Sequence, residues 1–292
     1  MKGIATFFLV MTLFFTAQAQ GWVYGFKAGL NFSTLDGELE KDDTGATVEE
    51  FNRVGSFHVG VGFAYAFSDH FGARAELMYS QKGVRFRYDG ASYEILTSRV
   101  GNTIVSNGTR NTLNNVLNSY IDLPLVLYVR PLSWLEISFG PSAGLLVGST
   151  GSGSTTFSGK TTGGKTVPEH SLTLEYNYLG DETGEADVST TTELTIGSEK
   201  VDLPATVGAY FDIPRGDGSF FNSLDLGLNA GLSFYLSKTL YLGGRVNYGL
   251  SDVTNNNYDF SLVKLDAGNA RIPRADTDRN FSIQASVGFN LR

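Results

Sequence analysis

Residues 22–33 read Trp-Val-Tyr-Gly-Phe-Lys-Ala-Gly-Leu-Asn-Phe-Ser, and the pattern has a period of two. Every even position is apolar, whereas the odd positions are mostly small or polar. Because neighbouring side chains of a β-strand point to opposite faces, this alternation predicts a strand with one apolar and one polar face. We interpret the segment as the first strand of a transmembrane β-barrel.

Seven later segments repeat the alternation. They are residues 56–67, 71–80, 120–130, 134–148, 222–236, 240–250 and 280–292. A tilted strand of about 9–11 residues crosses a bilayer, and bacterial barrels have an even number of strands. The connections alternate between short turns, at 68–70, 131–133 and 237–239, and long polar loops, at 34–55, 83–119, 149–221 and 251–279. The sequence therefore predicts an all-β fold, an eight-stranded antiparallel up-and-down barrel with long outer loops and both termini in the periplasm.

Side-chain volume indicates which face points outward. The interior of an eight-stranded barrel is only just wide enough to be filled by side chains, so the bulky Leu, Phe and Tyr face must meet lipid. The Gly, Ser and Ala face then lines the lumen, and aromatic residues at the strand ends are expected in two interfacial girdles. The alternative is a secreted β-sandwich, whose second face would carry Lys, Glu and Thr toward water. Closure requires residues 22–33 to pair antiparallel with residues 280–292.

Several local features refine this prediction. The apolar positions change from odd to even numbers around Lys82-Gly83, which suggests a bulge, and Pro124 and Pro141 cannot donate to a strand ladder. The Gly/Ser/Thr tract 149–164 is typical of a linker. Alternation across residues 172–178 predicts either a hairpin with residues 193–196 above the membrane or a fifth membrane hairpin in a ten-stranded barrel. We favour the first, because these pieces are short and charged.

The N-terminus predicts export. Lys2 precedes an apolar run over residues 4–15 and then Ala17-Gln18-Ala19, a pattern typical of signal-peptide cleavage. Residues 1–19 are therefore expected to be a signal peptide and residues 20–292 the barrel domain. The chain has 22 Lys and Arg against 30 Asp and Glu, which argues against nucleic acid as a partner, and it has no cysteine.

Four stretches resemble the PorT-like outer-membrane β-barrel family. They are Gly25-Phe-Lys-Ala-Gly-Leu-Asn-Phe-Ser33, Ala75-Glu-Leu-Met-Tyr-Ser-Gln-Lys-Gly83, Tyr120-Ile-Asp-Leu-Pro-Leu125 and Tyr248-Gly-Leu-Ser-Asp-Val253. The resemblance implies a barrel in the outer membrane of a Gram-negative bacterium, and Pro124 fits the family pattern. The chain departs from that pattern in the length of residues 149–221 and in its C-terminal Phe-Asn-Leu-Arg, which lacks a terminal aromatic residue.

The candidate site residues are the charged positions on the predicted luminal face. They are Lys27, Arg74, Glu76, Asp122, Glu136, Asp225 and Arg245. Both signs are present, as a closed lumen needs, because an unpaired buried charge is costly. Our hypothesis is that these side chains form an ion-pair plug with a structural role.

Residues with catalytic or metal-binding chemistry are few. The three histidines, His58, His70 and His170, have no spacing typical of a metal site, so no metal and no cofactor is expected. A catalytic interpretation would pair luminal His58 with a luminal Ser or Asp, but we favour a packed polar core. The acidic residues of the first long loop, between Asp36 and Glu50, are interpreted as solvated, with divalent-ion bridging or capture of a basic partner as the alternative.

The sequence therefore predicts a non-enzymatic outer-membrane protein of structural or accessory role, and the family name suggests a secretion or uptake assembly as its setting. The alternatives are a narrow channel for small solutes and an enzyme acting on lipid or peptide at the outer leaflet. The expected partners are outer-membrane lipid, lipopolysaccharide and protein components of an envelope assembly.

Overall fold

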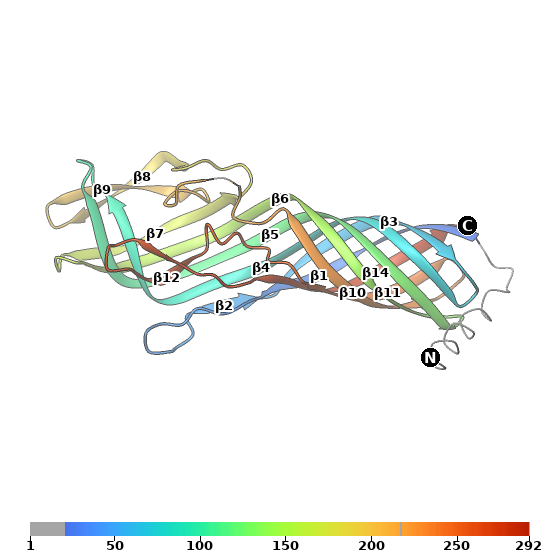
Figure 1. Cartoon of the computed structure of the whole chain (residues 1–292). Coiled ribbons are helices and arrows are strands. Elements are labelled where there is room, and N and C mark those ends of the chain that lie inside the picture. Colours follow the sequence, from blue (N-terminus) through green and yellow to red (C-terminus); the bar gives the residue numbers. More distant parts are fainter. Residues whose placement is uncertain (1–20, 217, 292) are drawn as a thin grey trace.

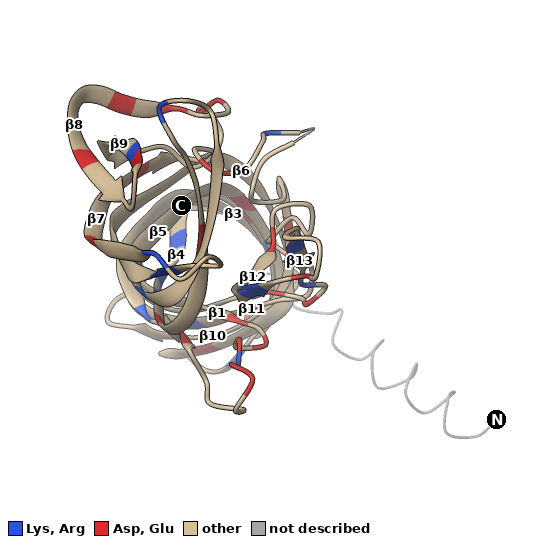
Figure 2. Ribbon diagram, turned by 90° about the vertical axis from the view of Figure 1, so that its left-hand side faces the viewer, with Lys and Arg blue, Asp and Glu red and all other residues tan. Residues whose placement is uncertain are grey.

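Eight strands of this chain pair into a closed antiparallel ring (Figures 1 and 2). The computed structural model describes residues 21–216 and 218–291. The ring strands are β1 (Gly21–Asp36), β3 (Val54–Ala66), β4 (Phe71–Thr97), β5 (Thr103–Leu132), β6 (Leu135–Thr161), β10 (Leu224–Tyr235), β11 (Leu240–Gly249) and β14 (Arg279–Leu291). Each pairs with its neighbours in the ring, and β10 closes it by pairing with β6. The expected pairing of the first and last strands is confirmed, from Tyr24 opposite Leu291 to Asp36 opposite Arg279.

The two ends of the ring differ. At one end the strands are joined by three short turns, and Gly21 and Leu291 also lie there; we call this the short-turn end. At the other, the extended end, β4, β5 and β6 continue far beyond the ring (Figure 1). The remaining strands also lie at the extended end. They are β2 (Glu49–Asn52), β7 (Thr166–Asn177), β8 (Ala186–Ile196), β9 (Glu199–Val207), β12 (Phe260–Leu265) and β13 (Arg271–Pro273).

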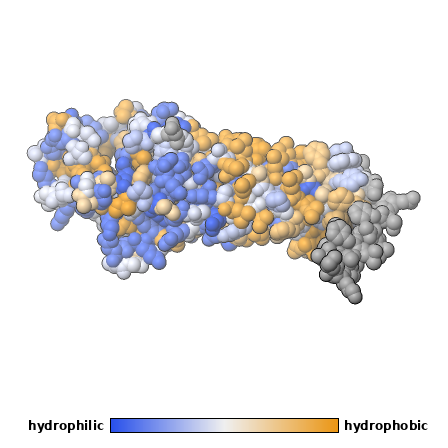
Figure 3. Space-filling view, viewed as in Figure 1, coloured by the Kyte–Doolittle hydropathy of each residue, from blue (hydrophilic) through white to orange (hydrophobic). Residues whose placement is uncertain are grey.

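The outward face of the ring is apolar. Leu, Val and Phe side chains that would be buried in a water-soluble protein are exposed here, for example Leu30 at 56% and Leu125 at 56%. Figure 3 shows them as a hydrophobic zone over the ring, whereas the extended end is largely hydrophilic. Such a large continuous apolar surface is expected only where lipid or a partner covers it. None of the described residues forms a helix long and apolar enough to span a membrane.

Aromatic side chains gather at both edges of this apolar zone. At the short-turn end, the rings of Trp22 and Tyr65 lie 5.2 Å apart, and Phe67 and Phe71 lie 5.1 Å apart. Toward the extended end, the rings of Phe57 and Tyr79 are 5.8 Å apart. These are the positions where interfacial girdles were expected, because amphipathic rings favour the boundary between lipid and water.

The predicted loops at 83–119 and 149–164 are wrong, because both segments are mostly strand. β4 and β5 stay in unbroken register from Met78 opposite Asp122 to Thr97 opposite Thr103, so β4 has no bulge against β5 at Lys82-Gly83. Even positions of β4 face inward both in the ring and beyond it, but their chemistry reverses from polar to apolar at Val84. The register shift lies instead on β6, at residues 146–148.

The extended end has a hydrophobic core of its own. β7 pairs antiparallel with β6, and β9 pairs parallel with β7 and antiparallel with β8. The predicted hairpin between residues 172–178 and 193–196 is therefore wrong in its pairing, because the partner of β8 is β9. These strands lie outside the eight-stranded ring, as we favoured. Buried apolar side chains hold them together, among them Phe157, Val167, Leu174, Ile196 and Val201.

The prolines interrupt the ladder only locally. Pro124 lies opposite Ser142 of β6, whereas the pairing of β4 with β5 skips Leu123 and Pro124 itself. Pro141 lies opposite Leu228 of β10. Since proline lacks a backbone N–H, each site loses one donor while the flanking pairs keep the register.

Candidate functional site

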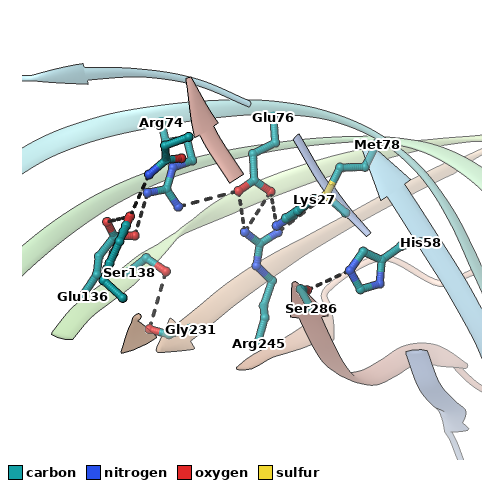
Figure 4. Close-up of polar contacts among 12 residues, drawn as sticks. Lys27, His58, Arg74, Glu76, Met78, Glu136, Ser138, Gly231, Arg245 and Ser286 are labelled. Atoms are coloured by element: carbon teal, nitrogen blue, oxygen red, sulfur yellow. Dashed lines mark hydrogen bonds and ion pairs between the residues drawn. The ribbon is translucent and has the colours of Figure 1, made fainter. Parts of the chain in front are cut away.

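Glu76 is the centre of a buried ion cluster inside the ring (Figure 4). One of its carboxylate oxygens, Oε2, lies 2.6 Å from Lys27 Nζ and 2.8 Å from Arg245 Nη2. The other, Oε1, lies 3.9 Å from Arg74 Nη1. The Glu76 side chain is only 2% exposed. Three strands thus supply cations to one carboxylate, because positions 27, 74 and 245 all point into the ring.

Glu136 extends this cluster toward the short-turn end. It accepts from Arg74 Nη2 at 2.7 Å, from Arg130 Nη2 at 2.9 Å and from the Tyr235 hydroxyl at 2.9 Å. Both guanidinium groups also lie over the Tyr128 ring, with centroid distances of 5.2 and 5.0 Å. We call Lys27, Arg74, Glu76, Arg130, Glu136 and Arg245 the inner ion cluster.

A second group, the outer ion cluster, consists of Lys82, Asp122 and Asp225. Lys82 Nζ lies 2.8 Å from Asp225 and 3.2 Å from Asp122, and the side chain is 2% exposed. The ammonium also lies 4.9 Å from the centre of the Tyr120 ring. Asn280 donates to Asp225 at 2.9 Å. These residues lie nearer the extended end of the ring than the inner cluster does.

All seven sequence-predicted site residues point into the ring, and each contacts an opposite charge. They carry three positive and four negative formal charges, so they do not balance alone. Two further cations were not among the predicted site residues: Arg130, which pairs with Glu136, and Lys82, which had been assigned to a bulge. Lys82 could have been found from its position, since it continues the even-numbered inward series of Arg74 and Glu76.

The spaces left beside the inner ion cluster are small. Two voids that Lys27 and Arg74 line have volumes of about 10 and 20 Å³. A cavity must have roughly 10–15 Å³ of such volume to hold one water molecule. Neither void is large enough for an organic solute.

His58 lies in the ring between Asn31 and Ser286. Its Nδ1 is 2.6 Å from Asn31 Oδ1, and its Nε2 is 2.8 Å from Ser286 Oγ. Asn31 donates its amide to Ser80 and to two carbonyls, so its Oδ1 accepts from Nδ1–H and His58 accepts from the Ser286 hydroxyl. This contact resembles a nucleophile and its base, but the void beside Ser286 is only the one of about 20 Å³. A substrate would have no room there.

The other two histidines are far from this pair in the fold. In a short turn, His70 Nδ1–H donates to the backbone carbonyl of Arg130, and at the extended end His170 pairs with Glu94 at 3.1 Å. Across the described residues, no group of three or more His, Cys, Asp and Glu side chains could hold a metal ion.

A larger space, the outer cavity, lies at the extended end. Its volume is about 260 Å³. It is lined by residues of β1, β2, β4, β5, β6 and β7, together with residues 209–213, 220–221 and 254–278. Its walls are mainly aromatic and aliphatic, with Phe51, Tyr176, Phe220 and Leu262 among them. This cavity was not predicted from the sequence, although the many aromatic residues in segments expected to be solvated loops were a signal.

Charged groups occupy two places in the outer cavity. Arg110 and Arg271 form one group, near Tyr93 and Asp212. The second group is Arg274, which contacts Glu49 at 3.0 Å and Asp276 at 2.6 Å, next to Asp259 and Asp278. Glu49 is only 3% exposed, so the interpretation of the first acidic loop as merely solvated is wrong for this residue.

Burial changes the protonation of the acidic side of the cavity. Together with the adjacent Asp276 carboxylate, it raises the pKa of Asp259 to about 8. Burial also raises the pKa of Asp278 to about 6. At neutral pH Asp259 therefore keeps a proton that a free aspartate would release, whereas Asp278 is mostly ionised.

We expect segment 251–278 to open more readily at pH 9 than at pH 6.5. The folded segment holds a proton on Asp259 that the opened segment, with an ordinary pKa of 3.8, releases. This stabilisation is complete below the ordinary pKa and is lost as the pH rises through about 8. Hydrogen exchange, corrected for intrinsic rates, measures the opening. Asp259→Asn should remove most of the difference, and a wild-type opening equilibrium that is the same at both pH values would contradict the assignment.

Comparison with known proteins agrees with this architecture. A family model described as outer membrane protein beta-barrel domain matches residues 17–255. The chain belongs to this family. It is therefore an outer-membrane β-barrel protein, and the predicted outer-membrane location is confirmed. The finer PorT-like resemblance stays a prediction from the sequence motifs, as does the signal peptide, which lies outside the described residues.

Three solved structures illustrate the similarity. The attachment invasion locus protein Ail of Yersinia pestis, in complex with the heparin analogue sucrose octasulfate, is 11% identical, with 92% of this chain and 99% of Ail covered and a TM-score of 0.35. Neisserial surface protein A is 10% identical, with 92% and 98% covered and a TM-score of 0.34. The outer membrane protease OmpT from Escherichia coli is 9% identical, with 94% and 98% covered and a TM-score of 0.31. No curated protein sequence matches this chain significantly.

Proposed function

We propose that this protein is a non-conducting, non-catalytic outer-membrane barrel that anchors its extended β-structure at the cell surface. Its role is structural or accessory within the envelope. The observation that carries this proposal is the pair of ion clusters inside the ring. Together they involve side chains from β1, β4, β5, β6, β10 and β11, and the voids beside the inner cluster are water-sized.

An apolar layer above the outer ion cluster supports the same proposal. Tyr120 contacts Lys82 on one side and belongs on the other to a buried cluster with Val84, Val116 and Phe221. Tyr120 is fully buried. An ion moving along the lumen would have to displace two sets of ion pairs and then this mainly apolar layer.

Recording in planar lipid bilayers tests the proposal. The folded protein should show no stable conductance, because the lumen is filled. A variant with Lys82, Tyr120 and Arg245 all changed to Ser should conduct, and it serves as the positive control for insertion. A stable, large conductance of the wild type would instead favour the narrow-channel alternative.

The catalytic alternative has one feature in its favour, the contact between His58 and Ser286. The small void beside Ser286 and the absence of a substrate space there weigh against it, and we therefore propose a structural role for the pair. His58→Ala should then affect folding stability rather than turnover of any lipid or peptide substrate.

The partners that we propose follow from the two surfaces of the molecule. The apolar zone of the ring suits membrane lipid, and the extended end suits contact with lipopolysaccharide or with proteins of a secretion or uptake assembly. Purification from detergent-solubilised outer membranes, followed by identification of bound proteins, tests the second part.

A further inference from the structure

The outer cavity is larger than the packing of a protein interior normally leaves. Protein cores contain few voids bigger than a water molecule, and an apolar cavity of about 150 Å³ can bind benzene. At about 260 Å³, the outer cavity has room for a larger apolar body. Its walls come from six strands and from other segments of the chain, so the space is a feature of the whole assembled extended end rather than of one loop.

Among the described residues, two cations of the cavity wall form no ion pair. Arg110 donates to Ser92 Oγ at 3.1 Å and to the Tyr93 carbonyl at 2.8 Å. Arg271 donates to the Asp212 carbonyl at 2.8 Å. Within residues 21–216 and 218–291, neither guanidinium has a carboxylate within 4.0 Å, although Asp212 lies near both. By contrast, Arg274 in the same cavity contacts two carboxylates.

The two arginines lie on either side of one residue. Arg110 holds the backbone carbonyl of Tyr93, and Arg271 lies beside the Tyr93 hydroxyl. Guanidinium groups bind carboxylates in a planar, two-bonded geometry that lysine cannot provide. A pocket with apolar walls and a few convergent polar groups is the usual form of a small-molecule site.

We propose that the outer cavity binds an amphipathic anion, an apolar body carrying one carboxylate. The body would lie against Phe51, Tyr176 and Phe220, and the carboxylate would face Arg110 and Arg271. A hydrophilic solute would leave the apolar walls without a partner, and a cation would meet two arginines. On the acidic wall, Arg274 contacts Glu49 and Asp276 and so reduces the repulsion that these carboxylates exert on an anion.

Two kinds of molecule combine an apolar body with one carboxylate, namely aromatic acids and fatty acids. The test uses the full chain in lipid nanodiscs, because detergent chains would compete for an apolar cavity. Calorimetric titration, corrected with empty nanodiscs, measures binding of 3-phenylpropionate and of octanoate. The neutral analogue 3-phenylpropanol and the small anion acetate show whether both the charge and the apolar body are needed.

We expect at least one of the two acids to bind, and to bind more tightly than 3-phenylpropanol and acetate. The double variant Arg110→Gln/Arg271→Gln should weaken that binding by about tenfold or more, since each charge-assisted hydrogen bond contributes strongly. Arg85→Gln is the matched control, because Arg85 is exposed on the outward face of β4 and bonds Asn115. It should leave the affinity unchanged.

A second variant tests the space independently of the charges. Ala209→Phe places a ring in the cavity that Ala209 lines and should abolish binding of both acids. A difference in electrophoretic mobility between unheated and heated samples shows that each variant is folded. Failure of both acids to bind the folded wild type would overturn the proposal. So would binding of 3-phenylpropanol as tight as that of the acids, or unchanged binding of the acids to the double arginine variant.

Discussion

Glu76→Gln should lower the free energy of unfolding by about 3–5 kcal/mol, because it leaves buried positive charge without compensation. Glu76 is almost completely buried and contacts Lys27, Arg245 and Arg74. Glutamine keeps the shape and one acceptor but loses the charge that holds three cations together. Urea titration in lipid vesicles, followed by fluorescence of Trp22 and Trp134, measures the change.

A double variant separates charge balance from packing. Lys27→Met removes a cation whose only ion-pair partner among the described residues is Glu76. Combined with Glu76→Gln, it should recover a large part of the lost stability, which a double-mutant cycle measures as a coupling energy. The control is Glu193→Gln, since the Glu193 side chain is 39% exposed and its pairs with Arg99 and Lys200 are solvated. It should cost less than about 1 kcal/mol. A similarly small loss for Glu76→Gln would rule out a compensated cluster.

The eight ring strands could be predicted because two physical limits act on them together. Lipid requires apolar side chains on the outer face, and the narrow lumen requires small or paired polar groups on the inner face. Segments such as residues 22–33 satisfy both, so the alternation is strict. Closure by pairing with residues 280–292 then follows from the even number of strands.

Beyond the ring these limits no longer apply, and the prediction failed there. Val84 and Tyr88 continue the inward face of β4, but they are apolar because they face the interior of the extended end, where Val84 also lines the outer cavity. Arg85 and Arg87 continue the outward face and meet water. The inward positions of β4 stay even-numbered while their side chains change from polar to apolar, and this change was mistaken for a bulge. It marks instead the place where the surroundings of β4 change from lipid to water.

The site was predictable in part for the same reason. Alternation alone assigns a charge such as Asp225 to the lumen, but it does not say which cation it meets. Lys82 reaches Asp225 from a strand that is distant in sequence, and only the closed ring brings the two together. The outer cavity depends on still more contacts, since Arg110 and Arg271 are 161 positions apart in the chain. No local pattern could have placed them on one wall.

The boundary between lipid and water can be tested with one strand. Leu125 lies midway along the ring portion of β5, on the outward face, and is 56% exposed. Leu125→Arg should destabilise the protein by about 2–4 kcal/mol, the cost of arginine near the bilayer midplane.

Leu113 is the matched control for this substitution. It lies on the same strand and the same outward face, is 39% exposed, and precedes Leu125 by twelve residues. At about 3.3 Å per residue this places it roughly 40 Å further along β5, in the extension. Leu113→Arg should therefore cost no more than about 1 kcal/mol. Both free energies come from the same urea titration in vesicles. Equal costs at the two positions would mean that the outward face of β5 has one environment along its whole length, and the reversal at Val84 would then need another cause.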